Sequence, residues 1–254
     1  MLYLLKVRKL LHELVVARPD EVHDFSPKKI INLKSLLLYP VDSKFNATVL
    51  ISEENDPTDS LGIYLSGLDL TQARIADTDN YDYVTYNFNG KMTKKIPKCS
   101  TYQIDIPTKD NNYNYMVEAK ITKEIIKSME KDTDFILAAL SGADNVSRTS
   151  SFEETVKMVE FLDSCIDKII ENAKLNFYTV FLVSTHGNIE SMYNEKHEKT
   201  SDYTTNKVPF LITDDNLELL DGSLANVAST ILDYMDIKIP ESMQKNRSLI
   251  KNKK

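Results

Sequence analysis

The sequence predicts an α/β fold in which a mostly parallel sheet is flanked by helices. Short apolar runs alternate with longer amphipathic segments, as they do in strand–helix–strand units. The 254 residues are enough to bury a sizeable core. The composition, 42% hydrophobic and 27% charged, is that of a globular protein. The length suits one large domain, or one domain with a fragment of another.

Residues 1–58 predict two elements and a connection. The apolar and basic stretch Met1–Val16 predicts a short helix, which Pro19 prevents from continuing. Leu33–Tyr39 is a nearly continuous apolar run and predicts a strand buried on both faces. The polar, mixed composition of Ser43–Thr58 is typical of a linker or loop.

The middle of the chain begins the strand–helix alternation. Gln72–Ala76 predicts a short element whose type the residues leave open. Glu118–Lys131 is rich in helix-forming residues and carries isoleucines along one side, so it predicts a helix. Phe135–Leu140 is a short, entirely apolar run and predicts a buried strand.

Glu153–Ile170 gives the clearest helix signal. Ser150 or Ser151 can cap its start, with a glutamate three residues further on. The apolar side chains recur with the period of a helix, and we expect them to share one face. This stripe comprises Val156, Val159, Leu162, Ile166 and Ile169.

The last third of the chain predicts two strands and a helix. The strands are Phe177–Val183 and Val208–Ile212, and the helix is Leu224–Met235. In that helix Leu224, Val227, Ile231 and Met235 fall in register.

Charge and apolar content exclude several classes of function. A net charge of −7 argues against duplex nucleic acid as the main partner. Every interior apolar run is far shorter than the ~18 residues that a membrane span requires. Lysines and arginines interrupt the apolar start, so it does not resemble a secretory signal. Two cysteines, Cys99 and Cys165, cannot build a disulfide framework. We therefore expect a cytoplasmic protein that binds neither membrane nor nucleic acid.

Several motifs resemble one enzyme family. The segments Ser184–Asn188 and Tyr203–Phe210 are similar to the C-terminal part of cofactor-independent phosphoglycerate mutase, a family of the alkaline-phosphatase-like superfamily. Gln72–Tyr81 resembles that family's Gln-Leu-Arg-Ile-Ala-Glu-Thr-Glu-Lys-Tyr. Asp134–Asp163 resembles its strand, metal loop and helix. Further matches near Gly222–Leu232 and at Ser248–Ile250 extend the resemblance over about residues 15–250.

The resemblance implies a domain organisation. In the family, a phosphotransfer domain is inserted within a phosphatase-type domain. Residues 1–45 then correspond to a remnant of the inserted domain and a linker, and residues 46–254 correspond to the phosphatase-type α/β domain. The family's first segment, with an aspartate metal ligand and the serine nucleophile, has no counterpart in this sequence. We therefore expect no catalytic residue here.

The resemblance also implies a degenerate metal site. The family uses two divalent metals, usually manganese, to hold the phosphoryl group. Two of the ligand positions keep their residue, Asp144 and His186. Three are replaced, by Arg148, Thr185 and Tyr203. An arginine cannot ligate a cation, because its guanidinium stays protonated and has no acceptor. No cofactor is expected for this chain, and Mn²⁺ only if the family activity survives.

The substrate positions are altered in the same way. Arg18 begins a segment that resembles the family's substrate-binding Arg-Pro-Asp-Arg, so Arg18 is a candidate ligand of 2- or 3-phosphoglycerate. The family's second arginine aligns with Glu21, and its lysine near the phosphate aligns with Asn80. The positive charge is lost at Asn80 and replaced by a negative charge at Glu21.

Each candidate has a structural alternative. Asp144 follows a strand and a glycine and is also typical of a turn or loop cap. His186 is equally compatible with a hydrogen-bonded structural histidine, and Arg18 with a surface ion pair. Arg148 and Lys207 are candidates for a new, small anion site near His186.

Three functions remain open from the sequence. One is an enzyme that interconverts 2- and 3-phosphoglycerate in glycolysis. A second is a pseudoenzyme that keeps the fold and serves as a binding or assembly module, with a protein partner or a second copy of itself. A third is a phosphatase or sulfatase with altered metals, for which two ligands are too few. We interpret the first as the ancestry of the chain and the second as its present function. The alternative is a fragment of an active manganese-dependent mutase.

Overall fold

The chain divides into two compact units. The computed structural model describes residues 36–37, 48–49, 60–92, 94–106, 113–200 and 202–253. The units are Met1–Asp56 and Pro57–Lys254. In the first, strand β1 (Leu36–Leu37) pairs in parallel with β2 (Thr48–Val49).

Several expectations fall on the first unit. The strand expected at Leu33–Tyr39 is seen at Leu36–Leu37. The loop expected at Ser43–Thr58 was wrong at Thr48–Val49, which form β2. The expected helix Met1–Val16 lies outside the described residues, as do Arg18 and Glu21.

The second unit alternates strands and helices along most of its length. Its elements are α2 (Leu61–Gly67), β3 (Gln72–Asp77), the π-helical η2 (Tyr83–Asn87), β4 (Cys99–Ile104), α3 (Tyr113–Glu130), β5 (Phe135–Ala138), α4 (Gly142–Thr149), α5 (Phe152–Leu175), β6 (Phe181–Val183), η3 (Ile189–Ser191), β7 (Phe210–Ile212), β8 (Leu217–Leu219), η4 (Leu224–Asn226), α6 (Val227–Tyr234), η5 (Glu241–Met243) and β9 (Ile250–Lys253).

A parallel sheet lies at the centre of this unit. Its strand order is β4-β3-β5, and Gln72 of β3 lies opposite both Cys99 of β4 and Phe135 of β5. Two antiparallel pairs accompany it, β6 with β7 and β8 with β9. The fold class, an α/β fold with a mostly parallel sheet flanked by helices, is confirmed. The open element Gln72–Ala76 is the central strand β3.

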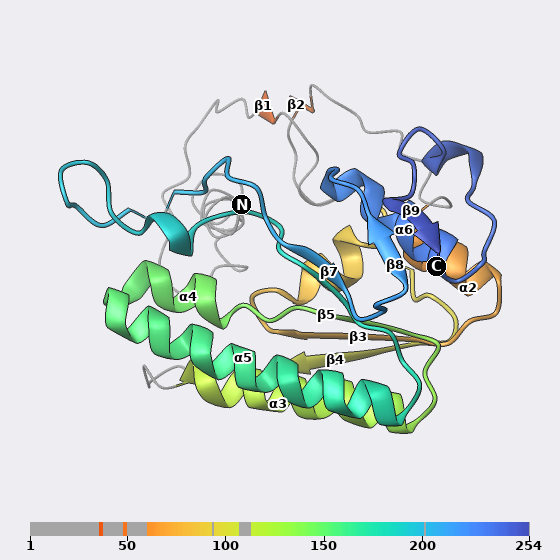
Figure 1. Cartoon of the computed structure of the whole chain (residues 1–254), viewed down its shortest axis with the longest axis horizontal. Coiled ribbons are helices and arrows are strands. Elements are labelled where there is room, and N and C mark those ends of the chain that lie inside the picture. The colour runs from red at the N-terminus through yellow and green to blue at the C-terminus, as the bar shows by residue number, and fades with distance from the viewer. Residues whose placement is uncertain are drawn as a thin grey trace. The chain divides into compact units, whose positions relative to one another are not determined.

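Helices cover the two faces of the sheet (Figure 1). On one face, Ile75 of β3 packs with Ile121 of α3 and Ile169 of α5 in one buried cluster. A second cluster joins Leu65 of α2 to Leu232 of α6, with Phe135 against it. Neighbouring side chains of a strand point to opposite faces, so the two clusters lie on opposite sides of the sheet.

The central strand β3 is buried at all six positions, and one of them is an arginine. The guanidinium of Arg74 donates to the side chain of Gln72 and lies 4.5 Å from the ring centre of Phe88 and 5.1 Å from that of Phe135. Burial lowers the pKa of Arg74 to about 10. A Cβ on Gly62 would meet this guanidinium at 2.6 Å, so the close approach of α2 requires a glycine there.

Helix α5 confirms the predicted element and its cap, but not its buried face. Ser151 Oγ accepts a hydrogen bond from the Glu154 N–H, so Ser151 is the N-cap. The helix begins at Phe152 and continues to Leu175 instead of ending at Ile170. The predicted stripe was wrong at Val156 and Val159, which are each 40% exposed. The residues that the helix buries are Thr155, Met158, Cys165, Ile169 and Ala173.

The other elements differ from expectation mainly at their ends. Helix α3 begins at Tyr113, ahead of the predicted Glu118. The strand predicted to start at Phe177 starts at Phe181, because Phe177 has a φ of 62° and is 97% exposed. The strand predicted over Val208–Ile212 covers Phe210–Ile212. The predicted last helix opens as the 3-10 turn η4 before α6. None of the helices in the described ranges is long and apolar enough to cross a membrane.

Candidate functional site

Helix α4 follows strand β5 directly and carries the first candidate residues. The N–H groups at the start of a helix have no partner within the helix. Here Ser141 N and Gly142 N donate to one oxygen of Glu118 on α3, at 2.9 and 2.7 Å. The Ser141 hydroxyl donates to Asp77 Oδ2 at the end of β3 (2.5 Å). Two acidic side chains from neighbouring elements therefore fix the N-terminus of α4.

Glu118 is almost fully buried, with 1% of its surface exposed. Burial raises the pKa of its carboxyl to about 7, and the charge of Asp77 raises it further. The hydrogen bonds from Gly142 and Ser141 act in the opposite direction, because they favour the carboxylate. The second oxygen of Glu118 is buried and has no hydrogen-bond partner.

Asn80 belongs to the same network. Its backbone N–H donates to Asp77 Oδ1 at 2.9 Å, and its side-chain amide donates to both oxygens of Asp77 at 3.1 and 3.0 Å. The position that the resemblance aligns with a lysine near the phosphate thus holds an amide turned towards a carboxylate of the chain itself.

The central contact of the site joins Asp144 to Arg148, one turn apart on α4. Arg148 Nε donates to Asp144 Oδ1 at 3.1 Å and to Oδ2 at 3.0 Å, and Nη2 donates to Oδ1 at 2.9 Å. Burial lowers the pKa of Arg148, but the hydrogen bond and charge of Asp144 outweigh this, so the pKa lies above its usual value. The two side chains are 25% and 31% exposed. The pair is bidentate and partly shielded from water.

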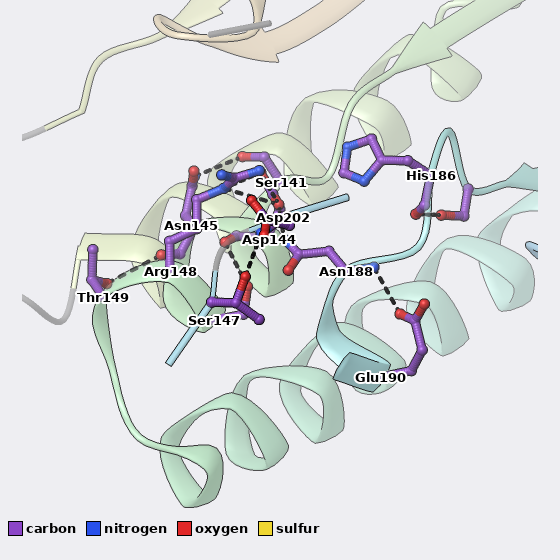
Figure 2. A network of polar contacts seen from close by, with 12 residues as sticks. Ser141, Asp144, Asn145, Ser147, Arg148, Thr149, His186, Asn188, Glu190 and Asp202 are labelled. Atoms are coloured by element: carbon purple, nitrogen blue, oxygen red, sulfur yellow. Dashed lines mark hydrogen bonds and ion pairs between the residues drawn. The ribbon is translucent and has the colours of Figure 1, made fainter. Parts of the chain in front are cut away.

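Asn188 connects this pair to the segment after β6. Its side-chain amide donates to Asp144 Oδ1, and its backbone N–H donates to Glu190 Oε2 at 2.7 Å. In Figure 2, Arg148 and Asn188 both reach the carboxylate of Asp144. We call Asp144, Arg148 and Asn188 the α4 latch, because they tie α4 to the loop that follows β6.

Two aromatic rings complete the site. The Tyr203 ring lies 3.8 Å from the ring of His186, centre to centre, with an angle of 34° between the planes. The guanidinium carbon of Arg148 lies 5.0 Å from the centre of the same tyrosine ring. His186 Nδ1 is buried without a hydrogen-bond partner, so the hydrogen-bonded alternative for His186 is not seen at this atom.

A second acidic group orders the loop beside the latch. Glu190 accepts from the Thr204 hydroxyl, from Asn206 Nδ2 at 3.0 Å and from Asn188 N. The Thr204 hydrogen bond is the main reason that the pKa of Glu190 falls to about 2. A Cβ on Gly187 would collide with the side-chain oxygens of Glu190 and Thr204, so a larger residue there would have to displace this hydrogen bond.

The described donor set does not fit a metal ion. Two of the three latch members are nitrogen donors directed at the carboxylate of Asp144, and one of them is a permanent cation. Across the described part of the chain, no group of three or more His, Cys, Asp or Glu is placed to hold a metal. No chemical step through a metal follows from these residues.

The structure brings together four of the five ligand positions of the resemblance. Asp144, Arg148, Tyr203 and His186 form a continuous chain of contacts. The fifth, Thr185, is exposed. Asp144 sits in the first turn of a helix and not in a loop, so the expected turn or loop cap was wrong.

The other candidates lie apart from this site. Lys207 pairs with Asp221 at 2.7 Å and Arg148 with Asp144 at 2.9 Å, so both candidates for a small anion site lie against carboxylates. Arg18 lies outside the described residues, and its role as a substrate ligand stays a prediction.

Sequence reasoning did not identify Glu118, Asn188 or Glu190. Glu118 lies in the middle of a helix, and no local pattern shows that its carboxylate reaches the start of another helix. Asn188 and Glu190 lie in or beside a quoted motif, but their partners are residues from other segments. One general rule was available: the N–H groups at a buried helix start need polar partners. The rule does not say which residue supplies them.

Comparisons with known proteins agree with this fold. Residues 31–239 match the family described as Metalloenzyme superfamily. A 2,3-bisphosphoglycerate-independent phosphoglycerate mutase of Metamycoplasma hominis is 32% identical over 97% of this chain and 49% of that protein. A protein with the same name from Mycoplasmoides gallisepticum is 36% identical over 72% of this chain and 37% of its own length.

A solved structure gives the same picture at the level of fold. The crystal structure of Leishmania mexicana phosphoglycerate mutase at low cobalt concentration matches with a TM-score of 0.78 and 19% identity. The match covers 96% of this chain and 48% of that one. The chain thus spans about half the length of the relatives that it matches.

Proposed function

The chain belongs to the metalloenzyme superfamily, and from this premise we propose that it is a catalytically inactive binding or assembly module built on the superfamily fold. One observation carries the proposal. The carboxylate of Asp144, a retained ligand position, is held by the guanidinium of Arg148 and the amide of Asn188. A positive charge supplied by the chain itself takes the place that a bound cation would need.

The chemistry of the contact supports this. A divalent ion needs oxygen or imidazole lone pairs, and arginine offers only donors. Displacing Arg148 would cost its hydrogen bonds to both oxygens of Asp144. The remaining ligand position with a suitable atom, His186, has its ring against Tyr203. One carboxylate and one imidazole are too few to hold two ions.

A second function is supported by the comparisons. The relatives named as phosphoglycerate mutases, and the isomerase reaction of glycolysis that their name implies, make a fragment of an active mutase the alternative. In that case the substrates are 2- and 3-phosphoglycerate, Mn²⁺ is the metal, and the protein works in the cytoplasm. The residues that would complete the site would then come from the half of the relatives that has no counterpart here.

Metal titration and an activity assay separate the two functions. We expect calorimetry of the full chain with MnCl₂ to show no saturable binding at micromolar concentrations, and a coupled assay with 3-phosphoglycerate to show no turnover. The M. hominis enzyme serves as positive control in both measurements. Two ions bound per chain, or turnover above about 1 s⁻¹, the low end for ordinary enzymes, would contradict inactivity and favour the alternative.

A further inference from the structure

We propose that the chain pairs with a second copy of itself, and that Leu175 and Phe177 of each copy enter the groove between α3 and α5 of the other. The inference rests on the proposed function, because it names the partner with which the module assembles. We call Leu175 and Phe177 the apolar knob, and the recess between the two helices the α3–α5 groove. Figure 1 shows α3 and α5 side by side along one face of the sheet.

The apolar knob is the most exposed large apolar feature that the structure describes. Phe177 is 97% exposed and Leu175 is 76% exposed, which are the two highest values among the large apolar side chains of the described residues. Single exposed apolar side chains are common on protein surfaces, but these two lie only two positions apart. Moving both out of water would be favourable. The knob is therefore a candidate contact surface.

The backbone at Phe177 adds a second observation. Helix α5 ends in a hydrogen-bonded turn, in which Tyr178 N donates to Ala173 O at 2.8 Å and Phe177 N donates to Lys174 O at 3.4 Å. In a Schellman turn of this kind, the residue with positive φ is usually glycine. Phe177 has a φ of 62° at that position, where a side chain costs free energy. Because its ring is almost fully exposed, a contact outside the chain is what would offset this cost.

The α3–α5 groove is suited to receive such side chains. Its volume of about 470 Å³ lies within the roughly 300–1,000 Å³ that is typical of pockets for small molecules. Ala119 and Ile126 of α3 line it on one side, and Phe161 and Cys165 of α5 line it on the other. A phenyl ring in the groove would also lie near ammonium groups, which favour the face of an aromatic ring. The lysines that line the groove are Lys123, Lys127 and Lys168.

The knob and the groove share one face of α5. Three groove residues, Phe161, Cys165 and Lys168, are followed on the same side of the helix by Asn172 and Leu175. The spacing alternates between four and three residues, which is the spacing that lets two helices pack along their length. A projection and a recess on one surface make that surface self-complementary. Pairing about a two-fold axis then closes as a dimer and does not continue into a filament.

An antiparallel arrangement of the two α5 helices makes both contacts at once. Leu175 lies ten residues after Cys165, which is about 15 Å along the helix. A two-fold axis midway between them places Leu175 of each copy over Cys165 of the other. The same axis brings Phe177 of each copy towards Phe161 of the other. Each copy thus gives one knob and receives one.

The charges close to this axis complement each other. Lys168 and Glu171 are both exposed and lie on either side of the midpoint. In the dimer, two lysines and two glutamates therefore meet near the axis, and each Lys168 lies beside Glu171 of the other copy. Complementary charges of this kind fix the register of two partners.

The area available is that of a small specific interface. Burying an aromatic side chain removes about 150–250 Å² from water. Two Phe177 rings and the groove walls that they cover would together bury roughly 600–1,000 Å². The two Leu175 side chains add to this, so the total reaches about 1,200 Å², the lower limit for stable specific interfaces. We therefore expect a reversible dimer with a Kd of roughly 1–100 μM.

Sedimentation equilibrium of the full chain over a range of concentrations tests the inference. The unaltered chain should show a monomer–dimer equilibrium, and Phe177→Gly should raise the Kd roughly tenfold or more. Glycine suits a φ of 62°, so the same variant should unfold at a higher temperature than the parent when both are dilute. A weaker dimer built from a more stable monomer excludes misfolding as the cause.

Charge variants test the arrangement of the two copies. Lys168→Glu places four acidic side chains near the axis and should weaken the dimer, whereas the double variant Lys168→Glu, Glu171→Lys restores the balance and should recover it. Leu220→Ala is the matched control, because it shortens an apolar side chain that is 49% exposed and lies outside α3 and α5. This control should leave the Kd unchanged.

Three results would overturn the inference. The first is a chain that stays monomeric up to about 200 μM, which is beyond the range expected for this interface. The second is a dimer that Phe177→Gly leaves intact, or that Leu220→Ala weakens equally. The third is a dimer that Lys168→Glu does not weaken, because the two copies would then not cross at this axis.

Failure of the pairing and failure of the proposed function are distinguishable. A dimer that turns over 3-phosphoglycerate would contradict the proposed inactivity and leave the pairing standing. A monomer without turnover would overturn the pairing and leave the inactivity standing.

Discussion

The first turn of α4 holds two carboxylates in different surroundings, its own Asp144 and Glu118 of α3. Asp144, on its exposed side, is paired with a guanidinium that holds both oxygens. Glu118, at its buried N-terminus, receives two backbone N–H groups and has the charge of Asp77 nearby. The two backbone N–H groups give Glu118 hydrogen bonds, but they bring no positive charge to balance an ionised carboxylate. The contrast is between a carboxylate with a cationic partner and a carboxylate without one, whose pKa burial raises to about 7.

The largest expected effect comes from removing the acceptor at the buried end. Glu118→Ala leaves the N–H groups of Ser141 and Gly142 without a partner. Each buried, unsatisfied group costs about 1–3 kcal/mol, so we expect a loss of about 3 kcal/mol in unfolding free energy. Urea unfolding at pH 6 measures it. Glu118→Gln keeps the acceptor oxygen and is the control; equal losses in the two variants would show that these hydrogen bonds contribute nothing.

The stability of the chain should depend on pH through Glu118 at the start of α4. The pKa of Glu118 is about 7 in the folded chain, above the usual 4.5, so the folded state binds the proton more tightly. Its contribution to stability is fully present below pH 4.5 and is lost as the pH rises through 7. The loss between pH 5 and 8 is roughly 2 kcal/mol. Glu118→Gln should flatten the curve over this window, and an unchanged curve would assign the slope to other groups.

Breaking the latch should cost less. Arg148→Ala leaves the carboxylate of Asp144 with the amide of Asn188, and the pair is partly exposed. Partly exposed ion pairs contribute about 1 kcal/mol, which sets the expected loss. Arg148→Lys keeps the positive charge but not the planar guanidinium that binds both oxygens. Its stability should lie between those of the parent chain and Arg148→Ala. Thermal unfolding at pH 7 and low salt measures the series, and an Arg148→Ala variant as stable as the parent would show that the latch does not stabilise the chain.

The smallest effect is expected at Lys207. Its ion pair with Asp221 has both side chains 90% exposed. Fully solvated pairs of this kind are screened by water and salt. Lys207→Ala should leave the unfolding midpoint unchanged within error, at low and at high salt. A clear shift would mean that exposure does not explain why Arg148 contributes more.

Much of the fold could be predicted from the sequence because its signal is local. The apolar run Phe135–Leu140 and the cap at Ser150 or Ser151 are read from neighbouring residues. The strand is found at Phe135–Ala138, two residues shorter than predicted, and the cap is Ser151. The buried face of α5 was misjudged at Val156 and Val159, because packing against α3 and α4 decides which face turns inward. Phe177 was assigned to a strand for its apolar character, although a left-handed backbone places it in the turn before the strand.

The candidate site was predicted in its parts but not in its connections. The resemblance marked Arg148 and Tyr203 as replacements, but no pattern showed that one would hold Asp144 and the other would pack on His186. Glu118 was invisible for a related reason. Its role depends on contacts with residues that lie more than twenty positions away, and sequence spacing carries no information about them.

The α4 latch also bears on how the site can change by substitution. Replacing Arg148 by a metal-binding residue would leave the carboxylate of Asp144 with the amide of Asn188 as its partner. Under the proposed inactivity, the ion pair would be lost before any metal binding was gained, because Tyr203 would still pack on His186. Selection for stability would then favour keeping the pair.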